Sequence, residues 1–242
     1  NSKIRVLELS GNILNKNDQL SPTYFEIFSK WEKISNFKNK ESLHEELWES
    51  FDTSPINNKF YKEISTKFKS LRNHLSDNKI YEDKEAAIYA NRLIGRIIFC
   101  WFLDKKGLID KKYNYFDSIR YEDDNQYYRE KLESLFFKVL NKPLKEREPT
   151  NLTNKIFEVD KFTPYLNGGL FEPKDSDYFS DSTLSFPTDF FDKLFEILNS
   201  YNFTTDESTS EYQQIAIDPE MLGNIFENLL RDIERNASTG AF

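Results

Sequence analysis

The chain has 242 residues, a formal net charge of −8 at pH 7, and 38% hydrophobic and 31% charged residues. This acidic balance argues against an autonomous nucleic-acid-binding module, although it is compatible with a local basic stripe. The single cysteine, Cys100, excludes an internal disulfide framework and fits a reducing cytoplasm. With only 7 Gly and 8 Pro but 22 Phe and 13 Tyr, the composition indicates an ordered chain with a ring-rich core.

No part of the sequence resembles a signal peptide or a membrane span. The longest apolar run, residues 93–103, is interrupted by Gly95 and Arg96 and is too short to cross a bilayer. We therefore expect a cytoplasmic protein without a membrane partner.

The first twenty residues read as a strand and linker. Residues 3–9, KIRVLEL, alternate in the way that predicts a short strand, which needs a partner strand; a frayed leader is the alternative. We therefore expect residues 1–20 to be separate from a helical domain over 21–242.

Two helices are predicted next. The first begins at Ser21-Pro22, since proline suits a first helical turn, and its apolar stripe comprises Tyr24, Phe25, Phe28 and Trp31. The second covers residues 41–51, with Leu43, Leu47, Trp48 and Phe51 at helical spacing. His44 lies beside that stripe and is interpreted as structural, because no second metal-ligating residue is near in sequence.

A long helix over residues 57–75 is the one strongly basic helix of the sequence. Its predicted core face comprises Phe60, Ile64, Phe68, Leu71 and Leu75. The candidates for contact with a DNA backbone are Lys59, Lys62, Lys69 and Arg72. A solvated helix face is the simpler interpretation of the same charges.

Two short matches to a restriction-nuclease site are rejected. Glu82-Asp83-Lys84 precedes a helix, whereas the Glu-x-Lys pair of such a site needs a strand. Glu172-Pro173-Lys174 contains a proline that breaks a central strand. We predict no metal site and no catalytic residue in this chain, and a stand-alone nuclease is the third-ranked hypothesis.

Residues 85–106 predict a central helix, because their interior is apolar nearly all round. Arg92 and Arg96 are its only deep charges and are expected to pair with carboxylates. Gly95 would permit a close helix crossing, and Cys100 is expected in the core. The helix should end at Lys105-Lys106-Gly107.

A further helix is predicted over 126–140, with an inward face of Tyr128, Leu132, Leu135, Phe136 and Val139. Another is predicted over 187–201, built around Phe190, Phe191, Leu194, Phe195 and Leu198. Between them, residues 162–173 read FTPYLNGGLFEP. The pair Gly168-Gly169 favours a turn, so a small hairpin is expected here. The fold class is therefore mainly α, a multi-helix bundle with short β elements near 3–9 and 162–173.

The last stretch, residues 217–242, carries the sharpest helix signal. Asp218 can cap it, Pro219 suits its first turn, and apolar residues recur at helical spacing up to Ile233. The string DPEMLGNIFENLL followed by TGAF resembles the segment that leads into the catalytic domain of N6-adenine DNA methyltransferases, in particular Eco57I-like type II restriction-modification enzymes. ANRLIGRIIFCWFLDKKGLI and YLNGGLFE resemble two further elements of that family, in the family's order.

This resemblance implies a helical, non-catalytic part of such an enzyme, linking the nuclease and methyltransferase parts and bracing DNA. It also implies that KIRVLEL, residues 3–9, would be a remnant of the nuclease domain. It also implies that Thr239, Gly240 and Phe242 line a cofactor pocket in the intact enzyme. The cofactors of that enzyme would be S-adenosylmethionine and Mg²⁺, with none in this fragment. The sequence contains neither the glycine loop nor the Asn-Pro-Pro-Tyr-like motif of the methyltransferase, so we predict a fragment that is inactive alone.

The expected partners are the missing nuclease and methyltransferase domains and DNA, the latter bound weakly or only by the intact enzyme. A different class of function is left open by the same residues. The acidic surface and exposed rings could serve a helical scaffold that binds another protein and has no role on DNA.

Overall fold

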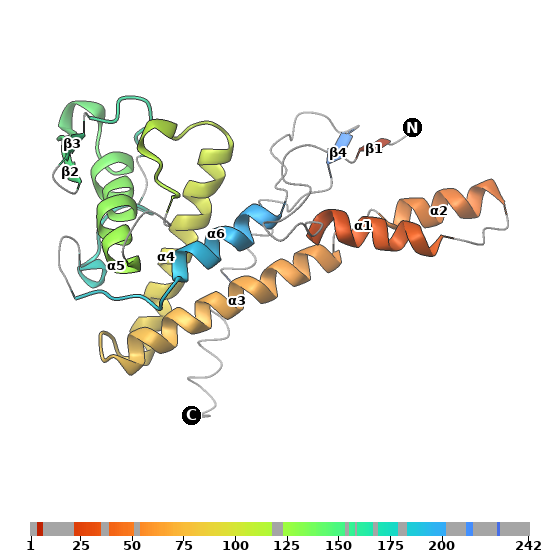
Figure 1. Cartoon of the computed structure of the whole chain (residues 1–242), viewed down its shortest axis with the longest axis horizontal. Helices are drawn as coiled ribbons and strands as arrows, with labels where there is room; N and C mark the ends of the chain where they lie inside the picture. Colours follow the sequence, from red (N-terminus) through yellow and green to blue (C-terminus); the bar gives the residue numbers. More distant parts are fainter. Residues whose placement is uncertain are drawn as a thin grey trace. The chain divides into compact units, whose positions relative to one another are not determined.

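A computed structural model describes residues 4–6, 22–34, 39–50, 54–117, 123–152, 155–157, 159–166, 169–178, 183–201, 212–214 and 227. The described residues are mainly α-helical, which confirms the predicted fold class (Figure 1). Contacts divide the chain into two compact units, Asn1–Ile64 with Glu196–Ile225 and Ser65–Phe195 with Phe226–Phe242. The predicted division between residues 20 and 21 stays a prediction.

Unit 1 contains the two short helices that the sequence predicts. They are α1 (Pro22–Lys33) and α2 (Lys40–Ser50), and they contact each other. Asn39 caps α2, because its Oδ1 accepts a hydrogen bond from the Ser42 amide at 2.7 Å while its own amide donates to Ser42 Oγ at 3.2 Å. This reciprocal pair satisfies amides that the helix itself leaves unbonded.

The predicted apolar stripe of α1 is partly wrong. Phe25 is 56% exposed, whereas Ile27 is fully buried. Two residues apart on a helix means about 200° apart around its axis, so these two side chains cannot share a face. The buried face of α1 is therefore centred on Ile27, with the rings of Phe28 and Trp31 half-buried and 5.5 Å apart.

The short strands differ in part from expectation. β1 (Ile4–Val6) is confirmed, and β4 (Tyr212–Gln214) supplies its partner in a parallel pair. The antiparallel pair is β2 (Thr150–Leu152) with β3 (Lys155–Phe157), which the sequence did not predict. The hairpin expected at 162–173 is wrong for the described residues, 162–166 and 169–173, which form no strand.

A physical reason for the missing hairpin lies in its backbone partners. The amide of Leu166 donates to Leu140 O at 2.9 Å, and the carbonyls of Leu170 and Glu172 accept from the Arg96 side chain. These backbone groups are thus bonded to Leu140 and Arg96 in place of partners in a two-stranded ladder. Asn167 and Gly168, the expected turn, lie outside the described residues.

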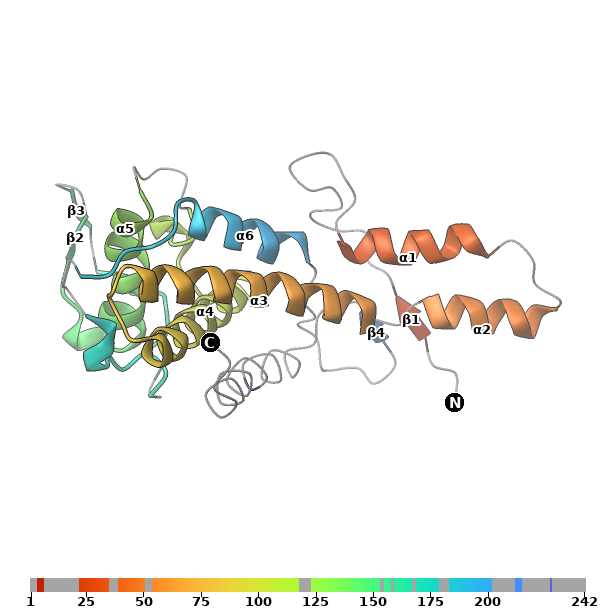
Figure 2. The ribbon, with the colours of Figure 1, turned by 90° about the horizontal axis from the view of Figure 1, so that it is seen from below.

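The long helix α3 (Ser54–Asp77) and the central helix α4 (Asp83–Lys105) are also confirmed. All five predicted core residues of α3 are buried, namely Phe60, Ile64, Phe68, Leu71 and Leu75. In unit 2 the C-terminal part of α3 lies beside α4 (Figure 2). α4 ends as predicted, with Lys106 at the cap and Gly107 at a φ of +70°, a conformation that glycine adopts at little cost.

By length and composition, α4 is long and apolar enough to cross a membrane, whereas the sequence analysis expected its apolar run to be too short for this. Among the described helices it alone is this long and apolar, and 67% of its most apolar 18-residue stretch is buried inside the protein. The core helix of a soluble protein has the same properties. Cys100 is buried on this helix, as predicted, and burial raises the pKa of its thiol well above the ordinary value.

The next helix begins as α5 (Asp124–Tyr127) and continues as two π-helical stretches, η2 (Tyr128–Leu132) and η3 (Ser134–Leu140). Its predicted inward residues are all buried, and its turns are wider than those of the expected α-helix. α6 (Phe190–Ser200) is confirmed with its five predicted core residues buried. Three short 3₁₀ turns complete the described elements: η1 (Lys111–Tyr113), η4 (Leu144–Glu146) and η5 (Asp175–Asp177).

The terminal helix predicted within residues 217–242 lies outside the described residues, apart from Glu227, which is helical. That prediction therefore stays a prediction.

Candidate functional site: the arginine anchor of α4

Two arginines project from the same side of α4, because residues four apart lie one above the other on a helix. Arg92 and Arg96 both reach a single acidic residue, Asp177, at the end of η5. Arg92 Nη2 lies 2.8 Å from Asp177 Oδ1, and Arg96 Nη1 lies 3.0 Å from Asp177 Oδ2. The predicted pairing of these arginines with a carboxylate is therefore confirmed.

The three charges are removed from water to different degrees. The side chains of Arg96 and Asp177 are 1% and 0% exposed, and that of Arg92 is 19% exposed. A buried carboxylate between two guanidinium groups has its charge compensated, and Asp177 Oδ2 also accepts a bond from the Lys174 amide at 2.9 Å. Each oxygen of this carboxylate is thereby satisfied.

Arg96 also binds the backbone of the NGGLFEP segment. Its Nε donates to the Leu170 carbonyl at 2.6 Å and its Nη2 donates to the Glu172 carbonyl at 3.0 Å. The residue between them, Phe171, is buried and packs on the rings of Phe99 and Phe136, with centroids 6.0 and 5.7 Å away. A planar guanidinium spreads five donors over three nitrogens and can bind three acceptors that lie apart, whereas a lysine has three donors on a single nitrogen.

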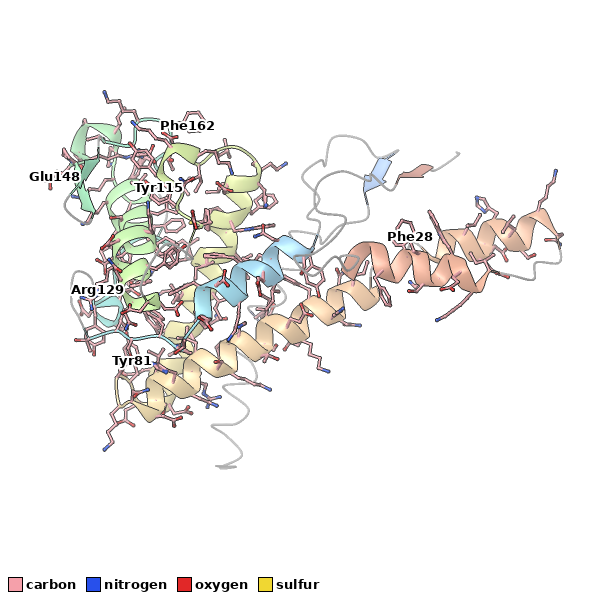
Figure 3. The ribbon with its side chains drawn as sticks, viewed as in Figure 1. Phe28, Tyr81, Tyr115, Arg129, Glu148 and Phe162 are labelled. Atoms are coloured by element: carbon pink, nitrogen blue, oxygen red, sulfur yellow. The ribbon has the colours of Figure 1, made fainter. Side chains whose placement is uncertain are left out.

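Tyrosines extend this network toward the start of α4. The Tyr81 hydroxyl donates to the Ser176 carbonyl, and Arg92 Nη2 donates to Ser176 Oγ at 2.9 Å. Tyr81 stacks on Tyr89 with ring centroids 5.3 Å apart, and Figure 3 labels Tyr81 in this part of the molecule. Burial raises the pKa of Tyr81 far above its ordinary value, so its hydroxyl stays a neutral donor.

We call residues Arg92, Arg96 and Asp177, with the carbonyls of Leu170 and Glu172, the arginine anchor. The charged and hydrogen-bonding groups of the arginine anchor bind one another, so its role is to hold two chain segments together. It fixes the described segment 169–178 onto α4.

The four predicted DNA-backbone residues lie on α3. Lys59 and Lys62 belong to unit 1, whereas Lys69 and Arg72 belong to unit 2, and the three lysines are exposed. Arg72 is held by Asp83, with Nε and Oδ1 2.7 Å apart. This hydrogen bond raises the pKa of Arg72 and lowers the pKa of Asp83. Contact of these residues with DNA stays a prediction.

The position of Asp83 also bears on the rejected nuclease match. Asp83 is the first residue of α4, so the helix begins two residues earlier than expected, and Asp83 and Lys84 lie within it and not on a strand. Among the described residues, no group of three or more His, Cys, Asp or Glu side chains could hold a metal ion. Thr239, Gly240 and Phe242 lie outside the described residues.

Sequence reasoning missed the residue at the centre of the anchor. Asp177 belongs to no motif or helical pattern that the sequence analysis identified, and it lies 85 residues from Arg92 in the chain. A lone acidic residue in a loop has no periodicity, so only the expectation that two buried arginines need a carboxylate pointed to it.

These features define a helical bundle whose central, buried helix clamps a downstream glycine-containing segment. Comparison with known proteins then gives the relationship. Residues 88–171 match the family model described as "MmeI, helicase spacer domain". That range begins within α4 and ends at Phe171, so it includes both arginines of the anchor and one of its two carbonyls.

The chain is also similar to a curated protein of Methanocaldococcus jannaschii named "Putative type II restriction enzyme and methyltransferase RM.MjaORFECS2P". The two are 28% identical over 245 residues, which is 95% of this chain and 18% of that protein. No solved structure matches. The chain is thus related to restriction-modification enzymes, which confirms the resemblance, and it spans about a fifth of the length of this relative.

Proposed function

We propose that the chain is the helical, non-catalytic part of a type II restriction-modification enzyme that methylates adenine N6 in DNA and cleaves DNA. In this role it links the nuclease part to the methyltransferase part and braces the DNA between them. The relationship to a restriction enzyme and methyltransferase over 95% of the chain supports the assignment.

One observation carries the linking role. The arginine anchor ties α4, where the spacer-domain match begins, to the segment in which that match ends. A buried clamp of this kind makes the two ends of the matched region one rigid body. Such rigidity is what a spacer needs in order to hold two catalytic parts at a fixed separation.

DNA bracing is the finer part of the proposal. The exposed lysines of α3, Lys59, Lys62 and Lys69, are suited to phosphate contacts, which position a duplex without reading its sequence. Arg72 contributes less, because its guanidinium already binds Asp83. Thr239, Gly240 and Phe242 would contribute to the S-adenosylmethionine pocket, and Mg²⁺ would serve the nuclease part.

The proposal is tested with the complete gene product. The purified protein is incubated with DNA and S-adenosylmethionine, and N6-methyladenine is measured by mass spectrometry of the digested DNA; cleavage is followed separately with Mg²⁺. We expect methylation that depends on S-adenosylmethionine. DNA that gains no N6-methyladenine and is not cut would contradict the proposal.

A protein-binding scaffold is the second candidate. Phe25 on α1 is 56% exposed, and a large exposed ring often marks a protein interface. This candidate predicts a stable complex in light scattering and pull-down experiments, lost in Phe25→Ser. A monomer that binds no partner, alongside measured methylation, would reject it.

A further inference from the structure

Three chain segments meet at the end of unit 2 where α4 terminates. The amide of Asp110, which follows α4, donates to Thr163 Oγ1 at 3.0 Å. Arg147, which follows η4, donates through Nη1 to the carbonyls of Asp160 and Thr163 at 2.6 and 2.9 Å. Residues 105–113, 142–147 and 159–166 are therefore held together by hydrogen bonds.

Asp160 is the buried centre of this junction. Its carboxylate accepts hydrogen bonds from the Phe162 and Thr163 amides at 3.0 and 2.9 Å, from Thr163 Oγ1 at 2.6 Å and from the Tyr115 hydroxyl at 3.2 Å. A carboxylate that binds the amides two and three residues on locks a tight turn. The side chain at the tip of this turn, Phe162, is consequently fixed on the outside.

Phe162 is the most exposed large apolar residue in the described part of the chain, at 61%. Figure 3 shows it at the outer edge of the ribbon, with Tyr115 further inside. A ring held in the open on a hydrogen-bonded turn gains nothing for the core, so its position suits contact with a ligand.

Each of these three segments carries exposed lysines. We call the following exposed residues the lysine–phenylalanine surface: Lys105, Lys106, Lys111, Lys112, Lys145, Lys161 and Phe162. Lys111 is paired with Asp104 at 2.5 Å, and Glu146 and Glu148 are exposed nearby in sequence. Residues 104–112, 138–148 and 159–166 nevertheless contain nine Lys or Arg against five Asp or Glu, in a chain of net charge −8.

We propose that the lysine–phenylalanine surface binds double-stranded DNA. The lysines contact phosphates on the backbone, and Phe162 packs against sugar and base edges. The choice of DNA as the ligand rests on the proposed function, while the location comes from the geometry. Lysines spread over three hydrogen-bonded segments suit a chain of regularly spaced phosphates, and an adjacent ring adds apolar contact.

The electrostatic half of this proposal is tested by binding a fluorescent 30-base-pair duplex to the 242-residue protein over a range of salt. Lys112→Gln, Lys145→Gln and Lys161→Gln together remove one cation from each segment and leave the Lys111–Asp104 pair intact. We expect affinity at low salt to fall by roughly tenfold or more, and the slope of log affinity against log salt to fall by about 3.

A control with the same change in net charge separates a local effect from a general one. Lys84→Gln, Lys174→Gln and Lys193→Gln remove three exposed lysines elsewhere in unit 2. We expect near-wild-type affinity and salt slope. Equal losses in the two triple variants, or no measurable binding by the wild type at low salt, would overturn the proposal.

The ring is tested separately, because its contribution has no charge. Phe162→Ala should weaken duplex binding by about three- to tenfold at every salt concentration, with an unchanged slope, because it removes partial burial of an apolar ring and no charge. Ile88→Ala, another exposed apolar residue of unit 2, should have no effect. A Phe162→Ala protein that binds the duplex as the wild type does would remove the ring from the proposal.

Two further outcomes distinguish this inference from the proposed function. If Lys59→Gln, Lys62→Gln and Lys69→Gln weaken duplex binding while the lysine–phenylalanine triple variant does not, the location is wrong and DNA bracing stands. If polyglutamate competes with the duplex as well as unlabelled duplex does, the surface binds an acidic protein instead. Methylation by the complete gene product, measured independently, decides the proposed function itself.

Discussion

Two arginine–aspartate contacts in unit 2 differ chiefly in their access to water. On α3, Arg72 binds Asp83 with side chains that are 21% and 47% exposed. On α4, Arg96 binds Asp177 with side chains that are 1% and 0% exposed. The residue types are the same, so the comparison shows what burial, together with the additional partners of Asp177 and Arg96, does to an ion pair.

The consequence is a difference in what happens when one partner is removed. An exposed charge that loses its partner is rehydrated, and such pairs contribute about 0–1 kcal/mol. A buried charge that loses its partner has no water to replace it, which costs about 3–5 kcal/mol. The α4 pair therefore fixes structure, whereas the α3 pair leaves its helix face open to solvent.

The largest effect is expected from Asp177→Asn. This substitution keeps the shape of the side chain but removes the charge that compensates Arg96 and Arg92, so the free energy of unfolding should fall by about 3 kcal/mol or more. Urea unfolding monitored by circular dichroism measures it. Asp175→Asn, on an exposed residue of the same 3₁₀ turn, is the matched control and should lie within about 0.5 kcal/mol of the wild type. Equal stability of both variants would contradict the buried anchor.

A smaller effect should separate the two arginines of α4. The lysine in Arg96→Lys cannot bind Asp177 and the carbonyls of Leu170 and Glu172 together. We therefore expect a loss of about 2 kcal/mol in the free energy of unfolding. Arg92→Lys should cost about half as much, because Arg92 is partly exposed. The same unfolding experiment ranks them, and a reversed order would show that the backbone contacts of Arg96 contribute little.

The smallest effect is expected from Asp83→Asn, and it should depend on pH. The hydrogen bond from Arg72 lowers the pKa of Asp83 in the folded state. The stabilisation is therefore present above the ordinary Asp pKa of about 3.9 and is lost as pH falls through the lowered value. Unfolding free energies of wild type and variant should differ by less than about 1 kcal/mol at pH 7 and converge in acid. A difference that grows as pH falls would have the wrong sign.

Much of the helical fold could be predicted from local patterns. The core faces of α3 and α6 follow from apolar residues at helical spacing, and the end of α4 follows from Lys105-Lys106-Gly107. The burial of Arg92 and Arg96 in an apolar stretch predicted that they pair with a carboxylate. These signals lie within one helix, where sequence spacing fixes geometry.

The remainder depends on contacts between distant segments. Asp177 binds Arg96, which lies 81 positions earlier in the chain, and no local sequence pattern predicts a contact over that separation. The expected hairpin at 162–173 fails for the same reason, because Arg96 takes its carbonyls. On α1, both Phe25 and Ile27 are apolar enough to be buried, so local spacing could not decide which face is covered. Lys105 and Lys106 were visible in the sequence, but the hydrogen bonds that join Asp110 and Arg147 to Thr163 were not.

The most direct test of the central claim uses Arg96→Lys in the complete gene product, at a temperature at which circular dichroism shows wild type and variant folded. N6-adenine methylation, Mg²⁺-dependent cleavage and hydrogen exchange of the amides in 169–178 are measured together. If the anchor holds the catalytic parts in register, exchange in that segment should rise and both rates should fall by about tenfold or more. Faster exchange with both rates unchanged would contradict the account.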